Sequence, residues 1–498
     1  MSVQTDPVSA RGAAPSEDGA PARHGLGLLV LSLAQLMVVL DATVVNIALP
    51  TAQQALGFSD ADRQWVVTGY ALAFGSLLLL GGRLSDFFGR KRMFVIGIAG
   101  FALASALGGA ANGFGLLLVA RVLQGVFGAV LAPAALSLLT TTFTQPKERS
   151  RAFAIFGGIS GAGGGVGLLL GGLLTEYASW RWCLYVNLLI AAAALVGAAV
   201  ALHEGERPAR PHLDLPGVAT SVLGLVGLVF GLAQAETEGW HSPATLVPLI
   251  AGVALLVVFV LVERRVEHPL LPLRVVLDRS RGGAYLTVAI AGIGMFGLFL
   301  FLTYYLATTL AFSPVQTGAA FLPMLAMLMV TAIALGTVLV PRMGPRPLVP
   351  TGALIAALGM ALLTRVDLDS TYVADVLPGL LVIGAGLGLV FAPAQNAATA
   401  GVEHGDAGVA SAMINTAQQI GGSIGTALLS SFAASSAAGS LAGRVPTPQL
   451  LAEAAVHSYH TVFWWSAGFL LLCAVLSAVL FRSGPLHVDP DAAPVLAH

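Results

Sequence analysis

Charged residues are scarce in this chain: Asp, Glu, Lys and Arg together make up 10% of its 498 residues. Ordinary soluble domains carry roughly 25%, and so few charges leave the surface of a soluble protein of this size uncovered. Hydrophobic residues account for 56%, with 59 glycines besides. This balance excludes a soluble enzyme, a nucleic-acid-binding protein and a disordered scaffold.

Cysteine and lysine are also rare. The two cysteines, Cys183 and Cys473, stand far apart in apolar runs, without a disulfide framework or a metal-ligand spacing. We therefore expect two buried thiols. Two lysines stand against 22 arginines in an Ala-rich chain, a bias that favours a bacterial genome rich in G and C.

The two ends of the chain are polar. Residues 1–24 are rich in Ala, Pro, Ser and Gly and predict a disordered cytoplasmic tail, and residues 483–498 form a second tail. The apolar run from Gly25 is too long for a signal-peptide core, and no clear cleavage site closes it. We expect a retained first membrane helix there.

Long apolar runs fill the rest of the chain. A membrane helix needs about 20 mainly apolar residues, and short loops separate the runs, which leaves no room for a soluble domain. The sequence predicts an all-α integral membrane protein with fourteen spans, near 25–50, 63–82, 93–111, 114–140, 152–175, 182–202, 215–235, 244–263, 283–310, 316–340, 347–365, 375–397, 407–432 and 459–481.

The loops between the spans carry an uneven distribution of basic residues. With the N-terminus inside, 19 Lys and Arg residues fall on the inner side and four on the outer side. Because cytoplasmic loops are enriched in these residues, the bias predicts two cytoplasmic termini in a bacterial inner membrane. An even number of spans follows.

Two charged stretches divide the spans into groups of six, two and six. The predicted parts are an N-terminal six-helix bundle (25–202), a linker with two extra transmembrane helices (203–281) and a C-terminal six-helix bundle (282–482). Duplicated transporters use such halves, with the substrate site between them near the midplane.

Asp41 lies near the middle of the first span, in VVLDATVVNIALP. A carboxylate at the bilayer centre costs roughly 2.5–3.5 kcal/mol on insertion scales, so it needs a partner or water. Such a group can take up and release a proton as its surroundings alternate. The alternative is a carboxylate that only bonds a neighbouring helix. Asn46 is a helix-to-helix contact or a residue of a substrate cavity.

Arg121 is the one basic residue within a span, in LLLVARVLQGVFGAV. Gln124 follows at i+3 and shares its helix face. Since Arg keeps its proton, it must face protein, a carboxylate or water. The alternative is that its side chain reaches the nearby outer interface.

The fifth span is unusually rich in glycine. Nine of the sixteen residues from Gly157 to Gly172 are Gly, although each costs about 1 kcal/mol in a helix relative to Ala. Small residues permit close helix contacts, and they also permit bending. We expect a bending element, with static close contact as the alternative.

The loop after the second span, GGRLSDFFGRKR, orders Gly82, Asp86, Gly89, Arg90 and Lys91 at the inner surface. A basic cluster there can be a topology anchor only. The fixed order of acid, glycine and bases suggests in addition a latch that holds the inner side shut.

These motifs together resemble the major facilitator superfamily, in its fourteen-helix drug:proton antiporter branch. LDATVVNIALP is similar to that branch's first-helix signature, GGRLSDFFGRKR to the loop signature of the superfamily and ARVLQG to the fourth-helix signature. The glycine-rich fifth helix followed by WRWCLYVN resembles the antiporter signature. The resemblance covers residues 25–482.

The resemblance implies two six-helix bundles that rock about a central cavity. It implies proton coupling for Asp41 and Arg121, and inter-half contacts that stabilise the outward-open state for the inner loop. It also implies that fifth-helix glycines shape a bend; these are Gly163, Gly167, Gly171 and Gly172.

The chain departs from the family pattern at two prolines. Leu168 stands where the fifth-helix motif has Pro, and Leu189 replaces a Pro often found after Asn187. Any kink must then come from glycines alone. The last six spans hold no acid deep in the membrane, which favours neutral, zwitterionic or singly charged amphiphilic substrates.

Polar side chains at depth are the remaining candidates for the substrate cavity, with helix-to-helix hydrogen bonding as the alternative for each. The candidates are Asn46, Gln124, Tyr304, Tyr305, Asn396, Asn415 and Gln418.

We therefore expect a proton-driven exporter of a hydrophobic or amphiphilic small molecule such as an antibiotic. The proton gradient is its energy source, with no cofactor, no metal and no nucleic acid, and we expect a monomer in the lipid bilayer that is not an enzyme. The rival within transport is a carrier of an endogenous metabolite, which predicts a more polar cavity. A membrane-embedded transferase needs clustered Asp for a metal-bound diphosphate, and no such cluster is present.

Overall fold

The computed structural model describes residues 20–143, 145–202, 214–267, 269–334, 336–400, 402 and 407–484. These ranges are almost entirely helical and contain no strand. The predicted all-α fold is confirmed. The first helix begins at Ala20, before the expected start at Gly25. Most of both predicted tails and residues 203–213 of the predicted linker lie outside the described residues.

The first half of the chain forms six long helices. They are α1 (Ala20–Leu56), α2 (Asp60–Phe88), α3 (Arg90–Gly109), α4 (Phe114–Thr142), α5 (Pro146–Tyr177) and α6 (Trp182–Ala201). Two more helices form a hairpin, α7 (Leu215–Glu238) and α8 (Pro243–Glu263).

The second half contains shorter segments as well as long helices. They are α9 (Leu273–Val276), α10 (Arg279–Tyr304) with the π-helical turn η2 (Tyr305–Thr309), α11 (Pro314–Ala320), α12 (Leu322–Ala334), α13 (Gly336–Met343), α14 (Pro345–Leu363), the π-helical turn η3 (Tyr372–Val376), α15 (Leu377–Thr399), α16 (Ala407–Leu441) and α17 (Pro448–Leu480).

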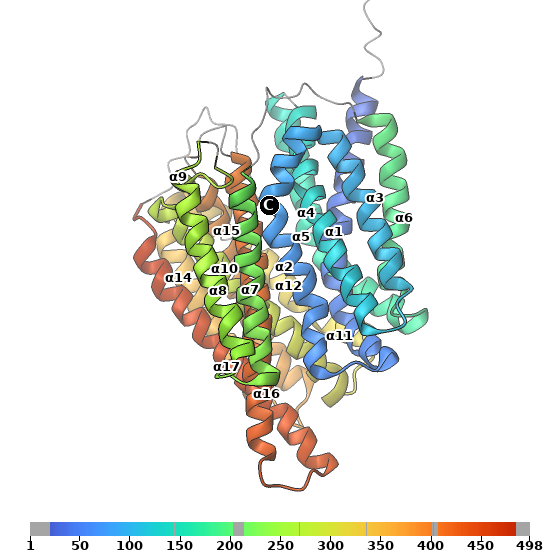
Figure 1. The fold of residues 1–498 in the computed structure, drawn as a ribbon, viewed down its shortest axis with the longest axis vertical. Coiled ribbons are helices and arrows are strands. Elements are labelled where there is room, and N and C mark those ends of the chain that lie inside the picture. Colours follow the sequence, from blue (N-terminus) through green and yellow to red (C-terminus); the bar gives the residue numbers. More distant parts are fainter. Residues whose placement is uncertain are drawn as a thin grey trace, which may run out of the picture.

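Thirteen helices within the described ranges are long and apolar enough to cross a membrane. α11 and α12 count as one of them, from Pro314 to Ala334. Each matches one predicted span, and α5 occupies the place of the fifth. α16 and α17 run well beyond the predicted ends near 432 and 459, and Figure 1 shows their hairpin extending past the other helices.

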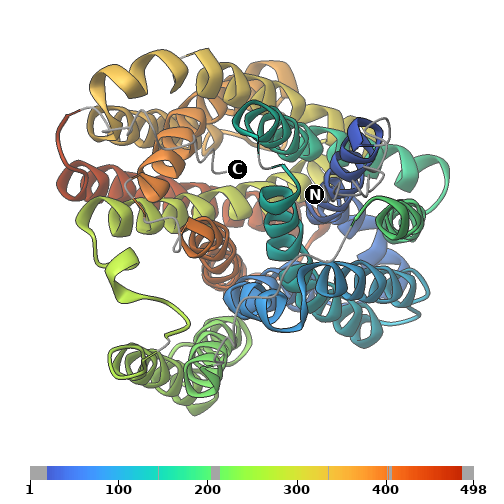
Figure 2. The same cartoon turned by 90° about the horizontal axis from the view of Figure 1, so that it is seen from above.

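The helices form two bundles and one appended hairpin. Figure 2 shows α1–α6 on one side, the later helices on the other and α7–α8 apart at the edge. α7 packs against α2 and α16, whereas α8 packs mainly against α7. The two bundles meet where α1 contacts α10 and α11, α2 contacts α16, and α5 contacts α11 and α12.

Local chemistry sets several helix ends. The Ser59 hydroxyl accepts from the N–H of Asp62 and the Asp62 carboxylate accepts from the Ser59 N–H, a capping box that starts α2. Gly89 separates α2 from α3 with a φ of 103°, a backbone angle that glycine adopts readily. Asp214 caps α7 by accepting from the Gly217 N–H.

Two ends of the molecule need names. We call the end that carries the α2–α3 connection and residues 83–92 the basic end; it is the upper end in Figure 1. The α1–α2 connection lies at the opposite end, which we call the far end. If basic loops are cytoplasmic, the basic end faces the cytoplasm.

Candidate functional site

Asp41 and Arg121 form an ion pair inside the first bundle. Nη1 of Arg121 lies 2.6 Å from Oδ2 of Asp41. Asp41 is 0% exposed and Arg121 2% exposed, so neither side chain reaches lipid or water. Nε of Arg121 donates to the Val66 carbonyl at 3.0 Å, and the guanidinium lies over the Tyr70 ring, 4.4 Å from its centroid.

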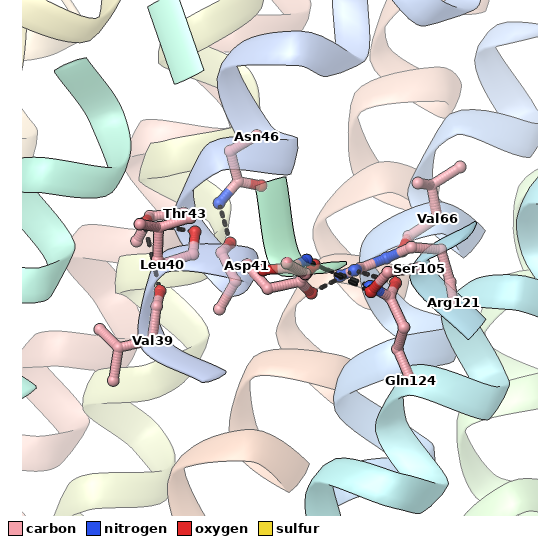
Figure 3. A network of polar contacts seen from close by, with 11 residues as sticks. Val39, Leu40, Asp41, Thr43, Asn46, Val66, Ser105, Arg121 and Gln124 are labelled. Carbon is pink, nitrogen blue, oxygen red and sulfur yellow. Dashed lines mark hydrogen bonds and ion pairs between the residues drawn. The ribbon is translucent and has the colours of Figure 1, made fainter. Parts of the chain in front are cut away.

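Two amide side chains hold the other carboxylate oxygen. Nε2 of Gln124 donates to Asp41 Oδ1 at 2.8 Å, and Nδ2 of Asn187 donates to the same oxygen at 2.7 Å. Gln124 also accepts from Arg121 Nη1 at 2.8 Å and donates to the Ser105 hydroxyl at 2.7 Å. Figure 3 shows Arg121, Gln124 and Ser105 converging on Asp41.

The network draws on five helices. α1 supplies the carboxylate, α2 a carbonyl and a ring, α3 a hydroxyl, α4 the guanidinium and an amide, and α6 a second amide. The hydrogen bonds from Arg121, Gln124 and Asn187 all donate to Asp41, so they suit an ionised carboxylate. A proton on Asp41 would remove its attraction for a cation that cannot lose its own charge. The arrangement can therefore couple protonation to helix movement.

Three members of the network were absent from the sequence prediction of the site. Ser105 is the one hydroxyl residue in α3, and Asn187 is the one amide in α6. A single polar residue in an otherwise apolar helix was the available signal. Tyr70 gave no such signal, because an aromatic residue in a membrane span is counted with the apolar residues around it. The Tyr70 hydroxyl and Asn187 Oδ1 are buried without a hydrogen-bond partner.

Asn46 follows Asp41 on α1 but takes no part in the network. Its Nδ2 donates to the Ala42 carbonyl at 3.1 Å within its own helix. Figure 3 shows the Asn46 side chain directed away from Arg121. Gln124, predicted for the substrate cavity, is instead 0% exposed within the Asp41 network.

The inner loop residues have separate contacts. Nζ of Lys91 donates to the Leu202 carbonyl at the end of α6, at 2.6 Å, within the first bundle. Nη2 of Arg83 donates to the Pro269 carbonyl, at 2.7 Å, and so joins α2 to the segment after α8. Gly82 has room for a Cβ, 3.8 Å from Pro133. The side chain of Asp86 lies outside the described residues, and Arg90 has a polar contact.

The glycines of α5 face two neighbours. A Cβ on Gly167 would stand 1.9 Å from the Thr43 hydroxyl, and one on Gly171 would stand 3.0 Å from Val44 Cα. A Cβ on Gly163 would approach Val39 at 3.1 Å. These three share a helix face, since they recur every four residues, and they bring α5 close to α1. Gly172 faces the other bundle instead.

Several contacts join the two bundles at the far end. A Cβ on Gly172 would lie 2.7 Å from the Pro314 carbonyl oxygen, and Glu176 accepts from the Val315 N–H at 3.0 Å. The Arg63 guanidinium lies over the Tyr304 ring, 4.2 Å from its centroid. This end of the interface is closed.

The predicted cavity tyrosines belong to that far end. The Tyr304 hydroxyl donates to Oε1 of Gln53 on α1, and the Tyr305 hydroxyl donates to the Asp367 carbonyl at 2.8 Å. Both rings are buried. Asn396, Asn415 and Gln418 are half-buried on α15 and α16.

The fold and the site together define a class of protein. Two six-helix bundles with a buried acid–base pair in the first are the arrangement of a secondary transporter. Residues 31–426 match the family profile described as Major Facilitator Superfamily. The chain belongs to the Major Facilitator Superfamily.

Two relatives are similar over nearly their whole length. The chain is 50% identical to the puromycin resistance protein pur8 of Streptomyces alboniger, over 93% of this chain and 93% of the relative. It is 38% identical to the cephamycin export protein CmcT of Amycolatopsis lactamdurans, over 97% and 100%. The predicted membership of this superfamily is confirmed.

A solved structure has the same fold at low sequence identity. It is a bacterial homologue of the human lysosomal transporter Spinster, in an inward-facing and unoccupied conformation. The TM-score is 0.66, with 17% identity over 95% of this chain and 98% of that chain.

Proposed function

We propose that this protein exports a hydrophobic or amphiphilic antibiotic-like molecule from a bacterial cytoplasm in exchange for protons. The proposal rests on the buried Asp41–Arg121 pair in a chain of this family. The printed names of its relatives support the substrate class, since they include puromycin resistance, cephamycin export and tetracenomycin C resistance and export.

The proton step follows from the geometry of the pair. With Asp41 ionised, its two oxygens accept from Arg121, Gln124 and Asn187 and hold α1 to α4 and α6. A proton on Asp41 weakens all these contacts, because hydrogen bonds to a charged group are stronger than those to a neutral one. The helices are then free to shift relative to each other, and loss of the proton restores the pair.

The energetics are adequate for export. One proton that enters down a potential of 100 mV releases about 2.3 kcal/mol. This corresponds to a concentration ratio of about fiftyfold for a neutral substrate, and a pH difference adds to it. The family supplies the transport cycle; the proton as coupling ion is our proposal.

The site of action follows from the distribution of basic residues. We infer that the basic end and both termini face the cytoplasm of a bacterial inner membrane. The closed far end then faces outward. We infer that the protein works as a monomer without a cofactor, because the groups that bind and release the proton all belong to one chain.

Concentrative uptake into inside-out vesicles tests the proposal. An imposed pH gradient should drive accumulation of puromycin, or of another member of an antibiotic panel, by the wild-type protein. Asp41→Asn should still exchange substrate but lose accumulation, since an amide cannot titrate. Glu453→Gln, at an exposed carboxylate of the far end, is the matched control.

Two outcomes would contradict the proposal. Accumulation by wild-type protein without any dependence on the pH gradient would exclude proton coupling. Undiminished accumulation by Asp41→Asn would make Asp41 a structural hydrogen-bond partner.

A further inference from the structure

A second pair of acidic side chains is buried at the basic end, outside the Asp41 network. Asp214 begins α7 and Glu263 ends α8, so the two residues stand at the open end of the same hairpin. Asp214 is 6% exposed and Glu263 is 3% exposed. Two ionised carboxylates in such a place would repel each other out of reach of water.

Each carboxyl group has one partnered and one unpartnered oxygen. Asp214 Oδ1 accepts from the Gly217 N–H at 2.8 Å, and Glu263 Oε2 accepts from the Leu271 N–H at 3.0 Å. Asp214 Oδ2 and Glu263 Oε1 are buried without a partner. The unpartnered oxygen of each group is therefore the one that is free to meet the other.

The two free oxygens border the same small space. A Cβ on Gly217 would stand 2.3 Å from Asp214 Oδ2 and 2.7 Å from Glu263 Oε1. A glycine at this position is what allows both carboxyl groups to approach the start of α7. Two oxygens are too few to hold a metal ion such as Ca²⁺ or Mg²⁺, which takes six or more ligands. A single proton between them satisfies both.

The charged groups on the surrounding elements do not offer a better counter-charge. Arg83 on α2 uses its guanidinium on the Pro269 carbonyl. α16 has no charged residue, and the other charged residues of α7 lie at its opposite end. Residues 203–213 and His268 lie outside the described residues. The charged residues that follow Glu263 along the chain to α10 are Arg264, Arg265, Glu267, Arg274 and Asp278, of which the first three are exposed.

We propose that Asp214 and Glu263 share one proton and form a proton-binding site at the basic end of the α7–α8 hairpin, separate from the Asp41–Arg121 network. The proton comes from the aqueous phase at that end and returns to it when the pH rises. While bound, it joins the start of α7 to the end of α8. Its loss leaves two facing carboxylates, which push the hairpin open.

The site is connected to the first bundle through the chain that follows α8. Glu263 holds the Leu271 N–H, and the neighbouring Pro269 carbonyl accepts from Arg83 of α2. A change in the protonation state of Asp214 and Glu263 is therefore transmitted to α2, the helix that leads into the 82–92 loop. This proposal does not depend on proton-driven export, because the site lies apart from Asp41.

Thermal unfolding across a pH series tests the shared proton. The folded protein keeps a proton that a carboxyl in the unfolded chain releases near pH 4, so the free energy of unfolding falls as the pH rises. We expect the Tm of wild-type protein in nanodiscs to fall between about pH 5 and pH 8 by roughly 1 °C or more per pH unit relative to Glu263→Gln. The amide of this variant donates to Asp214 at every pH.

Matched variants separate this site from other titrating groups. Glu267→Gln removes an exposed carboxylate four residues away and should follow the wild-type pH dependence. Asp214→Asn serves as a second variant if Glu263→Gln is unstable, because Asn remains a good N-cap. Equal pH slopes for the wild type and both amide variants would overturn the proposal.

Infrared difference spectroscopy gives an independent readout. Raising the pH should remove a protonated-carboxyl band from the wild type and from Glu267→Gln. The same band should be absent from Glu263→Gln and Asp214→Asn. A band that survives in both of these variants would assign the proton to other residues and overturn the proposal.

Discussion

The side-chain amide of Asn187 donates a hydrogen bond of 2.7 Å to Oδ1 of Asp41, from a helix 146 positions later in the chain. Asn187 also lies 3.3 Å from the Ser105 hydroxyl. It holds the carboxylate oxygen that does not pair with Arg121. Asn187 thereby adds α6 to the helices that are joined at Asp41.

Substitution Asn187→Leu should shift the pH dependence of transport. The carboxylate of Asp41 loses one donor, and a hydrogen bond to a charged group contributes about 1.5–3 kcal/mol. The ionised carboxylate then holds α1 to α6 less firmly, and we expect the pH profile of transport to shift relative to the wild type. Asn46→Leu is the control, since Asn46 bonds only to its own helix. A profile for Asn187→Leu identical to the wild type would contradict this role.

Single substitutions in the ion pair should destabilise the protein more than the double substitution does. Arg121→Gln leaves the buried Asp41 carboxylate without its cation, and Asp41→Asn leaves Arg121 uncompensated. Breaking a buried pair from one side costs about 3–5 kcal/mol, whereas neutralising both sides is often mild. The Tm of the Asp41→Asn/Arg121→Gln protein should exceed that of either single variant. Additive losses would show that the charges do not interact.

The far-end contact between Arg63 and Tyr304 should hold the two bundles together. Arg63 lies over the Tyr304 ring and is bonded to Asp60 at 3.3 Å. A cation–π contact contributes about 0.5–1 kcal/mol or more, so Arg63→Gln should increase opening at that end several-fold. A membrane-impermeant thiol reagent should then label Ala52→Cys faster, in protein lacking Cys183 and Cys473. Ala52 is buried and precedes Gln53, which accepts from the Tyr304 hydroxyl.

The control for this labelling experiment is Arg444→Gln. Arg444 is an exposed arginine in the α16–α17 connection, so its loss changes surface charge without touching the interface. Equal labelling of Ala52→Cys in the Arg63→Gln and Arg444→Gln backgrounds would show that Arg63 does not control closure.

Glu176 should make far-end closure sensitive to acid. Hydrogen bonds from the Ser313 side chain and the Val315 N–H hold the pKa of Glu176 below its usual range. A lowered pKa in the closed state means that the contact is fully formed above the ordinary value, near 4.3, and is lost as the pH falls through the lowered value. Closure should therefore be constant near neutral pH and weaken in acid.

Hydrogen exchange at the start of α11 measures this contact. Glu176→Ala should speed exchange of the Val315 amide several-fold at neutral pH, because the acceptor is removed. Glu176→Gln keeps a carbonyl acceptor that does not titrate, so its exchange should lack the additional acid sensitivity of the wild type. Unchanged exchange in Glu176→Ala would exclude the contact from closure.

The positions of the membrane-spanning helices were largely predictable from the sequence, because a run of apolar residues long enough to span a bilayer has few alternatives. The need for a partner at Asp41 was also predictable, since a lone charge in lipid is costly. The identity of the full network was not. Asn187 and Ser105 look like ordinary helix contacts until the fold brings α6 beside α1 and α3 beside α4 and α6.

Depth along a helix was harder to predict than the helix itself. Tyr304 and Tyr305 fall within a span, and nothing in their spacing indicated that their hydroxyls bond to Gln53 and to the Asp367 carbonyl at the far end. The glycines of α5 posed a similar problem. Close contact and bending require the same small residue, and only the position of α1 identifies the contact made by Gly167.

Gly172 provides the sharpest test of closure between the bundles. A methyl group at this position would stand 2.7 Å from both the Pro314 carbonyl oxygen and Val315 Cα, closer than side-chain and backbone atoms approach. Gly172→Ala should therefore separate α5 from α11 at the far end. Gly164→Ala is the matched control in the same helix, because nothing lies within 4 Å of its added methyl group.

Spin labels at exposed far-end positions measure the result. Tyr177 and Val373 are 77% and 71% exposed, on α5 and on η3 of the other bundle, so labels there need not disturb the interface. In Gly172→Ala the distance distribution should shift toward longer values, whereas in Gly164→Ala it should match the unsubstituted protein. Ala favours a helix by about 1 kcal/mol over Gly, so the control also shows whether stiffening α5 alone changes the distance. Identical distributions in the two variants would mean that α5 and α11 part without regard to this contact, and that closure rests on the Arg63 side of the interface.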